Sequence, residues 1–346
     1  MRVAILYYPM LFQRTGGLQV QVCETAHALR GIGVDAVLFD YSRHRLVDFD
    51  IAHVFSVISG NHRIVEQARS DGLPVVLSTV LHPPWSKAQN GRANLLSRVA
   101  ARLSGWSFTT THQQIQGGLS GADLVIALGK HEYEMLIGGY GVNQNKVHIV
   151  SNGIKAAFFQ ADERAFRERF DIQGPYALNV ASVSPYKNQM TALRALRGML
   201  PLVVIGPCAQ EHGGYLEELQ RYGGEWFNYL GVLDNDDPAL PSAYAGASVF
   251  VLPSKAEVQP ISALEAMAAD CPVIITKNHS LDVLSDRTAL PEAAPYDVDA
   301  IANFASELIA QPPAAGHLRN QVAELSWDKV ARQLLHIYAS LASGKS

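Results

Sequence analysis

Cysteine is scarce in this chain of 346 residues, and long apolar runs are missing from it. Cys23, Cys208 and Cys271 are far apart and odd in number, which excludes a disulfide framework and a C-x-x-C metal or redox motif. No stretch approaches the roughly 18 uninterrupted apolar residues of a membrane helix. The opening residues, MRVAILYYP, predict a core strand rather than a signal peptide. We therefore expect a globular protein of the reducing cytoplasm.

An excess of charge of either sign is also missing. The chain has 28 basic and 32 acidic residues and a formal net charge of −4, so no overall field attracts nucleic acid. Hydrophobic residues make up 48% of the chain, enough to bury a large core. The length favours two domains of ordinary size and no nucleic-acid partner.

Short apolar runs alternate with helical patterns along the chain, which is typical of parallel sheets covered by helices on both faces. In the first half the predicted strands are 2–7, 35–39, 51–55, 74–79, 124–128 and 147–150. In the second half they are 176–181, 202–205, 228–230, 248–252 and 273–276. The sequence therefore predicts an α/β protein with two doubly wound parallel sheets.

Turn and charge signals between Ser151 and Gly174 indicate a domain boundary. We assign residues 1–165 and 166–325 to two domains and residues 326–346 to a closing helix. This helix has an apolar face at helical spacing, which needs a partner. That face consists of Val330, Leu334, Tyr338 and Leu341.

Two carboxylates stand eight positions apart across a predicted strand-to-helix turn. Glu257 lies in the loop after the strand, and Glu265 lies in the helix predicted over 260–269. The N-terminus of such a helix suits a phosphate, and a carboxylate deeper in it can accept hydrogen bonds from the paired hydroxyls of a ribose. The alternative is that both glutamates are solvated charges on a helix face.

Other candidates also follow predicted strands. Gly16 and Gly17 precede the first helix and can let the backbone approach a ligand, although a structural turn explains them equally well. Lys187 ends a loop beside Asn188, a predicted helix cap, and can reach a phosphate or be merely solvated. His82 follows a buried strand and can contact a sugar hydroxyl or cap the core edge.

Some patterns predict less than they suggest. There is no G-x-G-x-x-G, which removes most support for a nicotinamide or flavin enzyme. Asp234-Asn235-Asp236 is similar to a D-x-D metal site but is more simply an acidic helix entry, and the closing SGKS lacks the first glycine of a P-loop. Residues 92–105 carry three arginines beside an apolar face, which is typical of an ordinary amphipathic helix or of a surface that contacts anionic lipid.

Taken together, the motifs resemble those of the family 4 retaining glycosyltransferases. They are, in order, Gly16-Gly17, ADLVIALGKHEYEML, VSNGI, VSPYKN, LVVIGP, LGVLDNDD with Tyr244, LPSKAEVQPISALEAMAADCPVI and SWDKVARQLLHIY. The resemblance covers nearly the whole chain. It implies the GT-B fold, in which two Rossmann-like domains face a cleft and the C-terminal helix crosses back to the N-terminal, acceptor-side domain.

The resemblance also implies roles for single residues. Lys187 would hold the donor diphosphate, Glu265 the ribose hydroxyls, and Glu257 the donor sugar near the reacting carbon. His82 would also touch that sugar. Donor contacts are further expected from Gly16, Gly17 and Ser182.

The sequence departs from the family pattern at two places. Ala181-Ser182 stands where Gly-Arg is usual, so one cation on the diphosphate is missing. Val258 and Pro260 replace the usual glycines after Glu257, and proline offers no N–H to the donor. Both changes predict weak donor affinity or an unusual donor.

The resemblance implies a retaining, metal-independent transfer of a sugar from a UDP- or GDP-sugar to an acceptor hydroxyl, without a cofactor. The expected acceptor is a bacterial polysaccharide or lipid-linked glycan. Two alternatives stay open: a GT-B nucleotide-sugar epimerase, and a weak or inactive partner subunit. Contact with a membrane surface through 92–105 would make the cytoplasmic enzyme peripherally membrane-associated.

Overall fold

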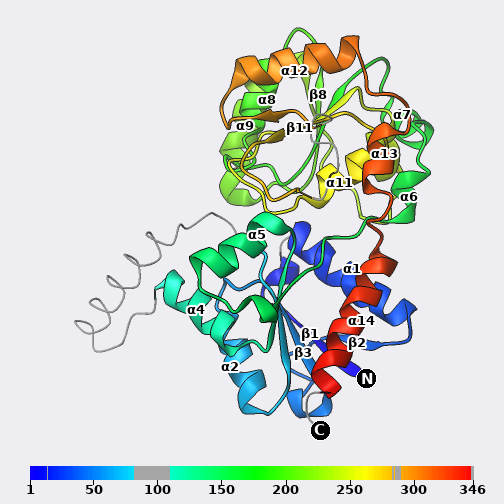
Figure 1. Ribbon diagram of the computed structural model, residues 1–346. Helices are drawn as coiled ribbons and strands as arrows, with labels where there is room; N and C mark the ends of the chain where they lie inside the picture. Colours follow the sequence, from blue (N-terminus) through cyan, green and yellow to red (C-terminus); the bar gives the residue numbers. More distant parts are fainter. Residues whose placement is uncertain (14, 82–109, 283, 285–289, 344–346) are drawn as a thin grey trace. The chain divides into compact units, whose positions relative to one another are not determined.

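The computed structural model describes residues 1–13, 15–81, 110–282, 284 and 290–343, and it contains two compact units. The first unit comprises most of residues 1–152 together with the closing segment from Trp327. The second comprises Gly153–Ser326 together with Thr15–Gly17. Each unit is built around one parallel sheet (Figure 1).

The sheet of the first unit has six parallel strands in the order β2-β1-β3-β4-β5-β6. β1 lies next to the edge strand β2, and its Val3 is paired with Ala36 of β2 on one side and with Ile51 of β3 on the other. The strands are β1 Arg2–Leu6, β2 Asp35–Leu38, β3 Ile51–Phe55, β4 Val75–Ser78, β5 Leu124–Ala127 and β6 Val147–Ile149.

Helices cover this sheet because its strands are apolar on both faces. The α-helices are α1 Gly17–Gly31, α2 His62–Ser70, α4 Thr111–Gly121, α5 Lys130–Glu134 and α14 Trp327–Ser343. Shorter turns are η1 Leu11–Gln13, η2 Leu46–Asp48, the π-helix η3 Met135–Gly139 and η4 Gln144–Lys146. The apolar face predicted for the last helix is real: Val330, Leu334 and Tyr338 are all buried.

The second sheet also has six parallel strands, in the order β9-β8-β7-β10-β11-β12. The chain winds outward from β7 to β9, returns to the other side of β7 at β10, and continues to β12. This is the doubly wound order in which the winding direction reverses between two central strands. The strands are β7 Ala177–Val180, β8 Leu202–Ile205, β9 Phe227–Tyr229, β10 Val249–Leu252, β11 Val273–Thr276 and β12 Glu292–Ala293.

Alternate residues of these strands face two different apolar layers. Phe250 and Leu252 of β10 pack into a cluster with residues of α6, α7, α10, α11 and α13. Val249 and Val251 pack on the opposite face with residues of α8, α9 and α12. Both faces are buried, which explains why the strands appear in the sequence as unbroken apolar runs.

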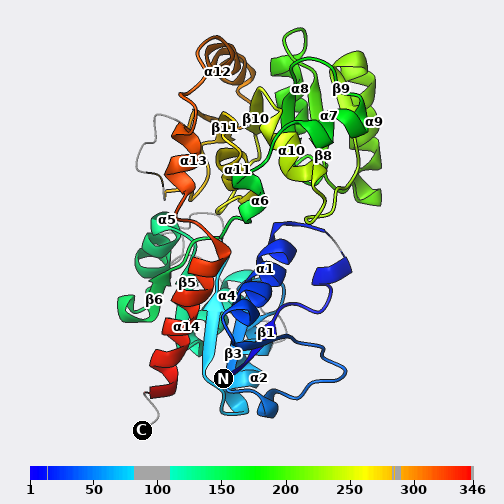
Figure 2. The ribbon, with the colours of Figure 1, turned by 90° about the vertical axis from the view of Figure 1, so that its right-hand side faces the viewer.

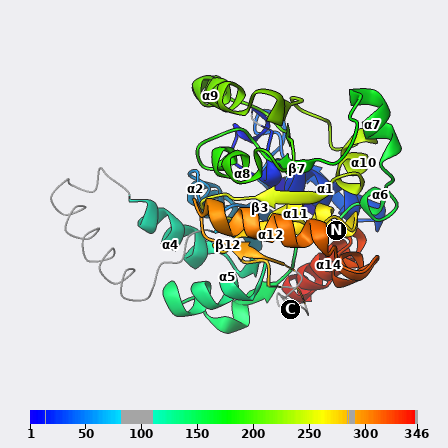
Figure 3. The same ribbon diagram turned by 90° about the horizontal axis from the view of Figure 1, so that it is seen from above.

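The helices of this unit lie on both faces of its sheet (Figures 2 and 3). The helix α12, orange in Figures 1 and 3, packs with α8, whereas α11 packs with α13. The bounds are α6 Ala156–Phe159, α7 Arg164–Phe170, α8 Gln189–Leu196, α9 Gly213–Gly223, α10 Ala239–Ala245, α11 Ile261–Ala268, α12 Val298–Ala310 and α13 His317–Val322. The short turns are η5 Gln210–His212 and η6 Gly224–Trp226.

The predicted α/β class and all eleven predicted strands are confirmed, each to within one residue at either end. The strand β12 was not predicted, because it has only two residues. Residues 153–165 were expected in the first domain but lie in the second unit. The reason is that Phe158 is buried in that unit's core against Tyr244. Within the described ranges, no helix has the length and apolarity needed to cross a bilayer.

A buried polar contact fastens the closing helix to the first sheet. His53 of β3 is fully buried, and its Nδ1 lies 2.6 Å from the Tyr338 hydroxyl of α14. Its Nε2 lies 2.8 Å from the Ser78 hydroxyl of β4. Burial lowers the pKa of His53 to about 3, so the ring is neutral in the folded protein at physiological pH.

This contact predicts a loss of stability in acid. In the unfolded chain His53 takes up a proton below its ordinary pKa of 6.5, whereas the folded protein does not until about pH 3, so stability falls as the pH drops between these values. From about pH 7.5 to about pH 5 the loss should be about 2 kcal/mol. Urea unfolding followed by circular dichroism should show a flatter pH dependence for His53→Gln, and an unchanged one for the exposed His27→Gln. Equal slopes in all three proteins would contradict the assignment.

Candidate active site

The carboxyl ends of β7 and β10 bring two loops together in the second unit. In a doubly wound sheet the loops after the two strands at the reversal diverge to opposite faces, and the crevice they leave is the usual ligand site. Here these loops are 181–188 and 253–260. They contain Lys187 and Glu257, two of the residues singled out in the sequence.

Asn188 ties the two loops to each other. Its backbone is left-handed, with φ of 58°, a conformation that asparagine tolerates better than most residues. Its Nδ2 donates to the carbonyl of Pro253 at 3.0 Å, and its Oδ1 accepts from the Thr191 hydroxyl at 2.8 Å. Asn188 occupies the N-cap position of α8, as predicted, but its side chain makes no cap hydrogen bond to the helix backbone and instead bridges the loops.

Two buried amide side chains, those of Asn179 and Gln189, support the loop that carries Ser182. Asn179 of β7 donates through Nδ2 to the carbonyl of Val251 in β10 at 2.7 Å. Gln189 donates through Nε2 both to Asn179 Oδ1 at 3.3 Å and to the Ser182 carbonyl at 3.0 Å. These buried amides fix the register of the loop that carries Ser182 and Lys187.

Lys187 and Glu257 form an ion pair across the reversal point. The Lys187 Nζ lies 2.6 Å from Glu257 Oε1, and the two side chains are 23% and 11% exposed. The backbone N–H of Glu257 donates to the Asn278 carbonyl at 2.8 Å, which fixes its loop against the end of β11. The site therefore presents a cation and an anion side by side, within reach of solvent.

Glu265 lies one turn into α11 and is 7% exposed. The hydroxyl of Tyr244 in α10 donates to its Oε2 at 3.0 Å. Burial, and next the charge of Glu265, raises the pKa of Tyr244 well above 10, so the hydroxyl keeps its proton. The sequence analysis included Tyr244 in a motif but gave it no role.

The other predicted site residues are not brought into this group by the described contacts. Gly17 is the first residue of α1, and neither it nor Gly16 has a positive φ or an atom close enough to exclude a Cβ, so a close backbone approach stays a prediction. His82 and residues 92–105 lie outside the described residues.

One polar residue of the site was missed. Ser254 is completely buried in the loop between Pro253 and Glu257, and its hydroxyl has no hydrogen-bond partner among the described residues. A serine directly after an apolar strand was the only signal in the sequence. Such an unpaired hydroxyl is uncommon in a folded protein.

The contact to the start of α10 comes from Asp237, the residue after the acidic run 234–236, so the helix-entry role of the run itself stays a prediction. The carboxylate of Asp237 accepts from the N–H of Ala239 at 2.9 Å, and Asp236 pairs with Lys155 at 2.6 Å. In the ranges that the structure describes, no group of three histidine, cysteine, aspartate or glutamate side chains is arranged to hold a metal ion.

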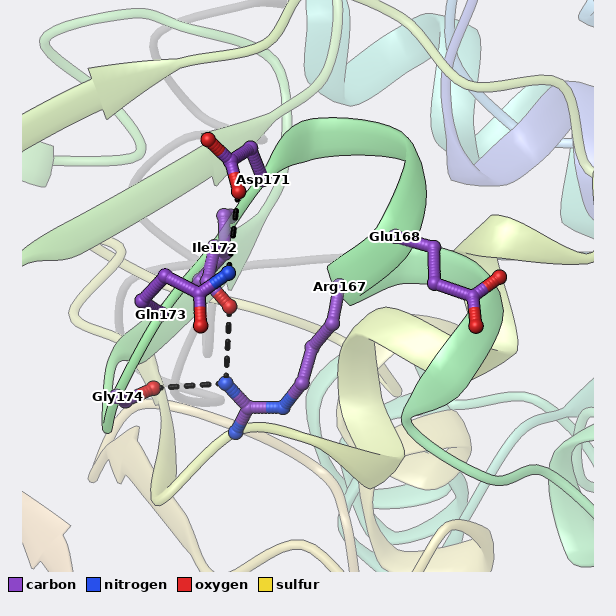
Figure 4. A pocket seen from close by; sticks show the side chains of 6 residues that line it. All are labelled: Arg167, Glu168, Asp171, Ile172, Gln173 and Gly174. Atoms are coloured by element: carbon purple, nitrogen blue, oxygen red, sulfur yellow. Dashed lines mark hydrogen bonds between the residues drawn. The ribbon is translucent and has the colours of Figure 1, made fainter.

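A hollow of about 360 Å³ at the end of α7 is not part of this site (Figure 4). Arg167 lines this hollow and donates hydrogen bonds to the carbonyls of Ile172 and Gly174, at 3.2 and 2.8 Å. Its Nη2 donates to the Gly246 carbonyl at 3.2 Å, and Glu168 extends away from the group. The guanidinium is committed to the backbone, which indicates a structural role.

With this geometry in view, comparison with known proteins shows what part of the chain is similar to. Residues 174–311, which include both loops and α11, match the family model described as Glycosyl transferases group 1. The resemblance noted in the sequence is confirmed over this segment. The fold class is confirmed as well, because the two parallel sheets are those of solved GT-B enzymes.

Among solved structures, sucrose-phosphate synthase from Thermosynechococcus elongatus has a TM-score of 0.75 and 17% identity, over 99% of this chain and 100% of its own. WaaG, a glycosyltransferase involved in lipopolysaccharide biosynthesis, has a TM-score of 0.62 and 16% identity, over 96% and 94%. At these identities the likeness concerns the fold alone.

Among curated proteins, the O-antigen chain mannosyltransferase B of Escherichia coli is 30% identical over 179 residues, 48% of this chain and 46% of the relative. The mannosylfructose-phosphate synthase of Agrobacterium fabrum is 26% identical over 238 residues, 62% and 52%. The chain thus spans about half the length of these relatives.

The attraction between Lys187 and Glu257 should be stronger than that within a surface pair, because both side chains are largely removed from water. A double-mutant cycle with Lys187→Met and Glu257→Gln, measured by urea unfolding, should give a coupling of about 1 kcal/mol or more. The matched cycle on the exposed pair Asp328 and Arg332 should give about 0.5 kcal/mol or less. Equal coupling in both cycles would contradict this burial argument.

Proposed function

We propose that this protein is a glycosyltransferase that moves a sugar from a nucleotide diphosphate sugar to an acceptor hydroxyl, with retention at the anomeric carbon and without a metal. The observation that carries the proposal is the Lys187–Glu257 pair at the reversal point of the second sheet, next to the helix that carries Glu265. The family match over 174–311 supports it. The first unit is the proposed acceptor-side domain, the second unit, mainly from Gly153 to Ser326, is the proposed donor-binding domain, and α14 is the proposed returning helix.

Lys187 is the proposed partner of the donor diphosphate. A phosphate oxygen is an alternative acceptor for its ammonium, so donor binding can exchange the Glu257 contact for a phosphate contact or share the cation between them. The cation then lies where negative charge develops as the diphosphate leaves, which lowers the barrier. The N–H groups at the start of α11 add to this field, although Pro260 contributes none.

Glu265 is the proposed ribose ligand, because a carboxylate accepts well from two adjacent hydroxyls. Glu257 is the proposed contact to the donor sugar near the reacting carbon. No carboxylate nucleophile is required in this scheme: the bond from the anomeric carbon to the diphosphate breaks, the acceptor oxygen bonds on the same face, and the departing phosphate takes the acceptor's proton. His82, Ser182, Gly16 and Gly17 complete the proposed donor contacts.

The proposed acceptor is a polysaccharide or a lipid-linked glycan of a bacterium, with the enzyme in the cytoplasm and residues 92–105 as the proposed contact to a membrane surface. Relatives named for O-antigen and mannosyl transfer support this direction. A panel of UDP- and GDP-sugars, with mannose donors first, tests the donor by thermal stabilisation. The product's anomeric configuration tests retention, and activity in a chelator tests metal independence.

Two rivals are separated by simple measurements. A nucleotide-sugar epimerase would convert the donor without an acceptor, whereas a transferase needs one. An inactive partner subunit is favoured by Ser182 and Pro260, which replace usual phosphate and donor contacts. Calorimetry that finds no binding of UDP or GDP at millimolar concentration would favour that reading.

Replacing Lys187 tests the central assignment. Lys187→Ala should lower kcat/KM by about a hundredfold or more, because it removes the charged partner of the leaving diphosphate. The matched control is Lys277→Ala, which removes an exposed lysine that follows the neighbouring strand β11. Near-normal turnover of Lys187→Ala with the donor found in the thermal screen would refute the role.

A further inference from the structure

Tyr244 is a fully buried tyrosine whose hydroxyl is used by a single described side chain. Its ring packs at 5.6 Å between centroids against Phe158 and at the same distance against Phe250. The hydroxyl donates to Glu265 Oε2 at 3.0 Å. The apolar core thus fixes the ring, and the ring fixes the position of one carboxylate oxygen.

This contact has a consequence for ligand binding. A glutamate side chain has three rotatable bonds, and ordering it when a ligand arrives costs free energy that weakens binding. A hydrogen bond from a rigid tyrosine orders the carboxylate in advance. The hydroxyl remains a donor at every working pH, because burial and the charge of Glu265 hold its pKa well above 10.

The core contains a comparison residue. Tyr176 is also completely buried in the same apolar cluster, and its hydroxyl donates to the Ala243 carbonyl at 2.6 Å. Both tyrosines satisfy a buried acceptor. Tyr176 donates to a backbone carbonyl, whereas Tyr244 donates to the side chain of Glu265, the proposed ribose ligand. The difference between the two separates orientation of Glu265 from support of the core.

We propose that Tyr244 is a positioning residue that orients Glu265 for recognition of ribose hydroxyls, so that it contributes to the preference for ribonucleotides over 2′-deoxyribonucleotides. This inference rests on the proposed function, in which Glu265 binds the ribose. Tyr244 itself touches no ligand in this scheme. It acts through the carboxylate alone.

The test compares two ligands with four proteins by calorimetry. The ligands are a nucleoside diphosphate, UDP or GDP, and its 2′-deoxy analogue; the proteins are the wild type, Tyr244→Phe, Glu265→Gln and Tyr176→Phe. Tyr244→Phe should weaken the ribonucleotide by about threefold to tenfold and change the deoxy analogue less, so that the ratio of the two affinities falls. Glu265→Gln should reduce that ratio further, whereas Tyr176→Phe should leave it as in the wild type.

The outcomes distinguish a failure of the ribose-binding role of Glu265 from a failure of the positioning role of Tyr244. If Glu265→Gln leaves the affinity ratio unchanged, the ribose assignment in the proposed function fails. If Glu265→Gln lowers the ratio but Tyr244→Phe does not, or lowers it only as much as Tyr176→Phe, the positioning role of Tyr244 is overturned while the proposed function stands. If Tyr244→Phe does not fold, 3-fluorotyrosine placed at position 244 keeps the shape and strengthens the donor; an unchanged ratio then overturns the proposal.

Discussion

The reversal of winding between β7 and β10 is the constraint on which the candidate site depends. Two adjacent parallel strands send their following loops to opposite faces of the sheet, so the loops part at the carboxyl edge. The divergence of the loops leaves a crevice at this edge of the sheet. Asn188 then connects the two loops through the Pro253 carbonyl, and the ion pair of Lys187 and Glu257 forms across the same gap. The chemistry of the site is therefore a consequence of the strand order.

The ion pair also answers an electrostatic problem. Lys187 is less than a quarter exposed and Glu257 about a tenth, so either charge alone would lose much of its hydration without compensation. Paired, each satisfies the other until a ligand with its own negative charge competes for the ammonium. The protein can thus hold a cation in a partly dry site while no phosphate is bound, because the neighbouring carboxylate offsets the loss of hydration.

Much of this organisation could be predicted from the sequence, and the failures have physical causes. The strands were predictable because both faces of each sheet are buried, which leaves uninterrupted β-branched runs such as 273–276. The position of Glu257 and Lys187 after such runs indicated the ligand edge. Their direct contact was not predictable, since they are seventy positions apart and are brought together by the pairing of β7 with β10.

Local rules failed where tertiary contacts took over. Asn188 precedes a helix, and capping is the usual role of asparagine there; the left-handed backbone and the bond to Pro253 replace that role. The boundary after 165 failed because α6 and α7 are short, with only one fully buried aromatic residue in each. Phe158 and Phe166 are buried in the second core, and nothing in their local pattern identifies which core they join.

Two glutamates at corresponding edges of the two sheets show how burial and partner type distinguish structure from function. In the first unit Glu132 is fully buried and accepts from the N–H groups of Leu81 and Leu128, both at 2.7 Å, and from the Thr79 hydroxyl at 2.6 Å. Backbone donors cannot leave, so this carboxylate is fixed as a support for the ends of β4 and β5. Glu257 instead faces a lysine side chain, which has several rotamers and can turn to another anion. A glutamate held by backbone donors is therefore fixed as a structural support, whereas one paired with a lysine side chain can exchange that partner for another group.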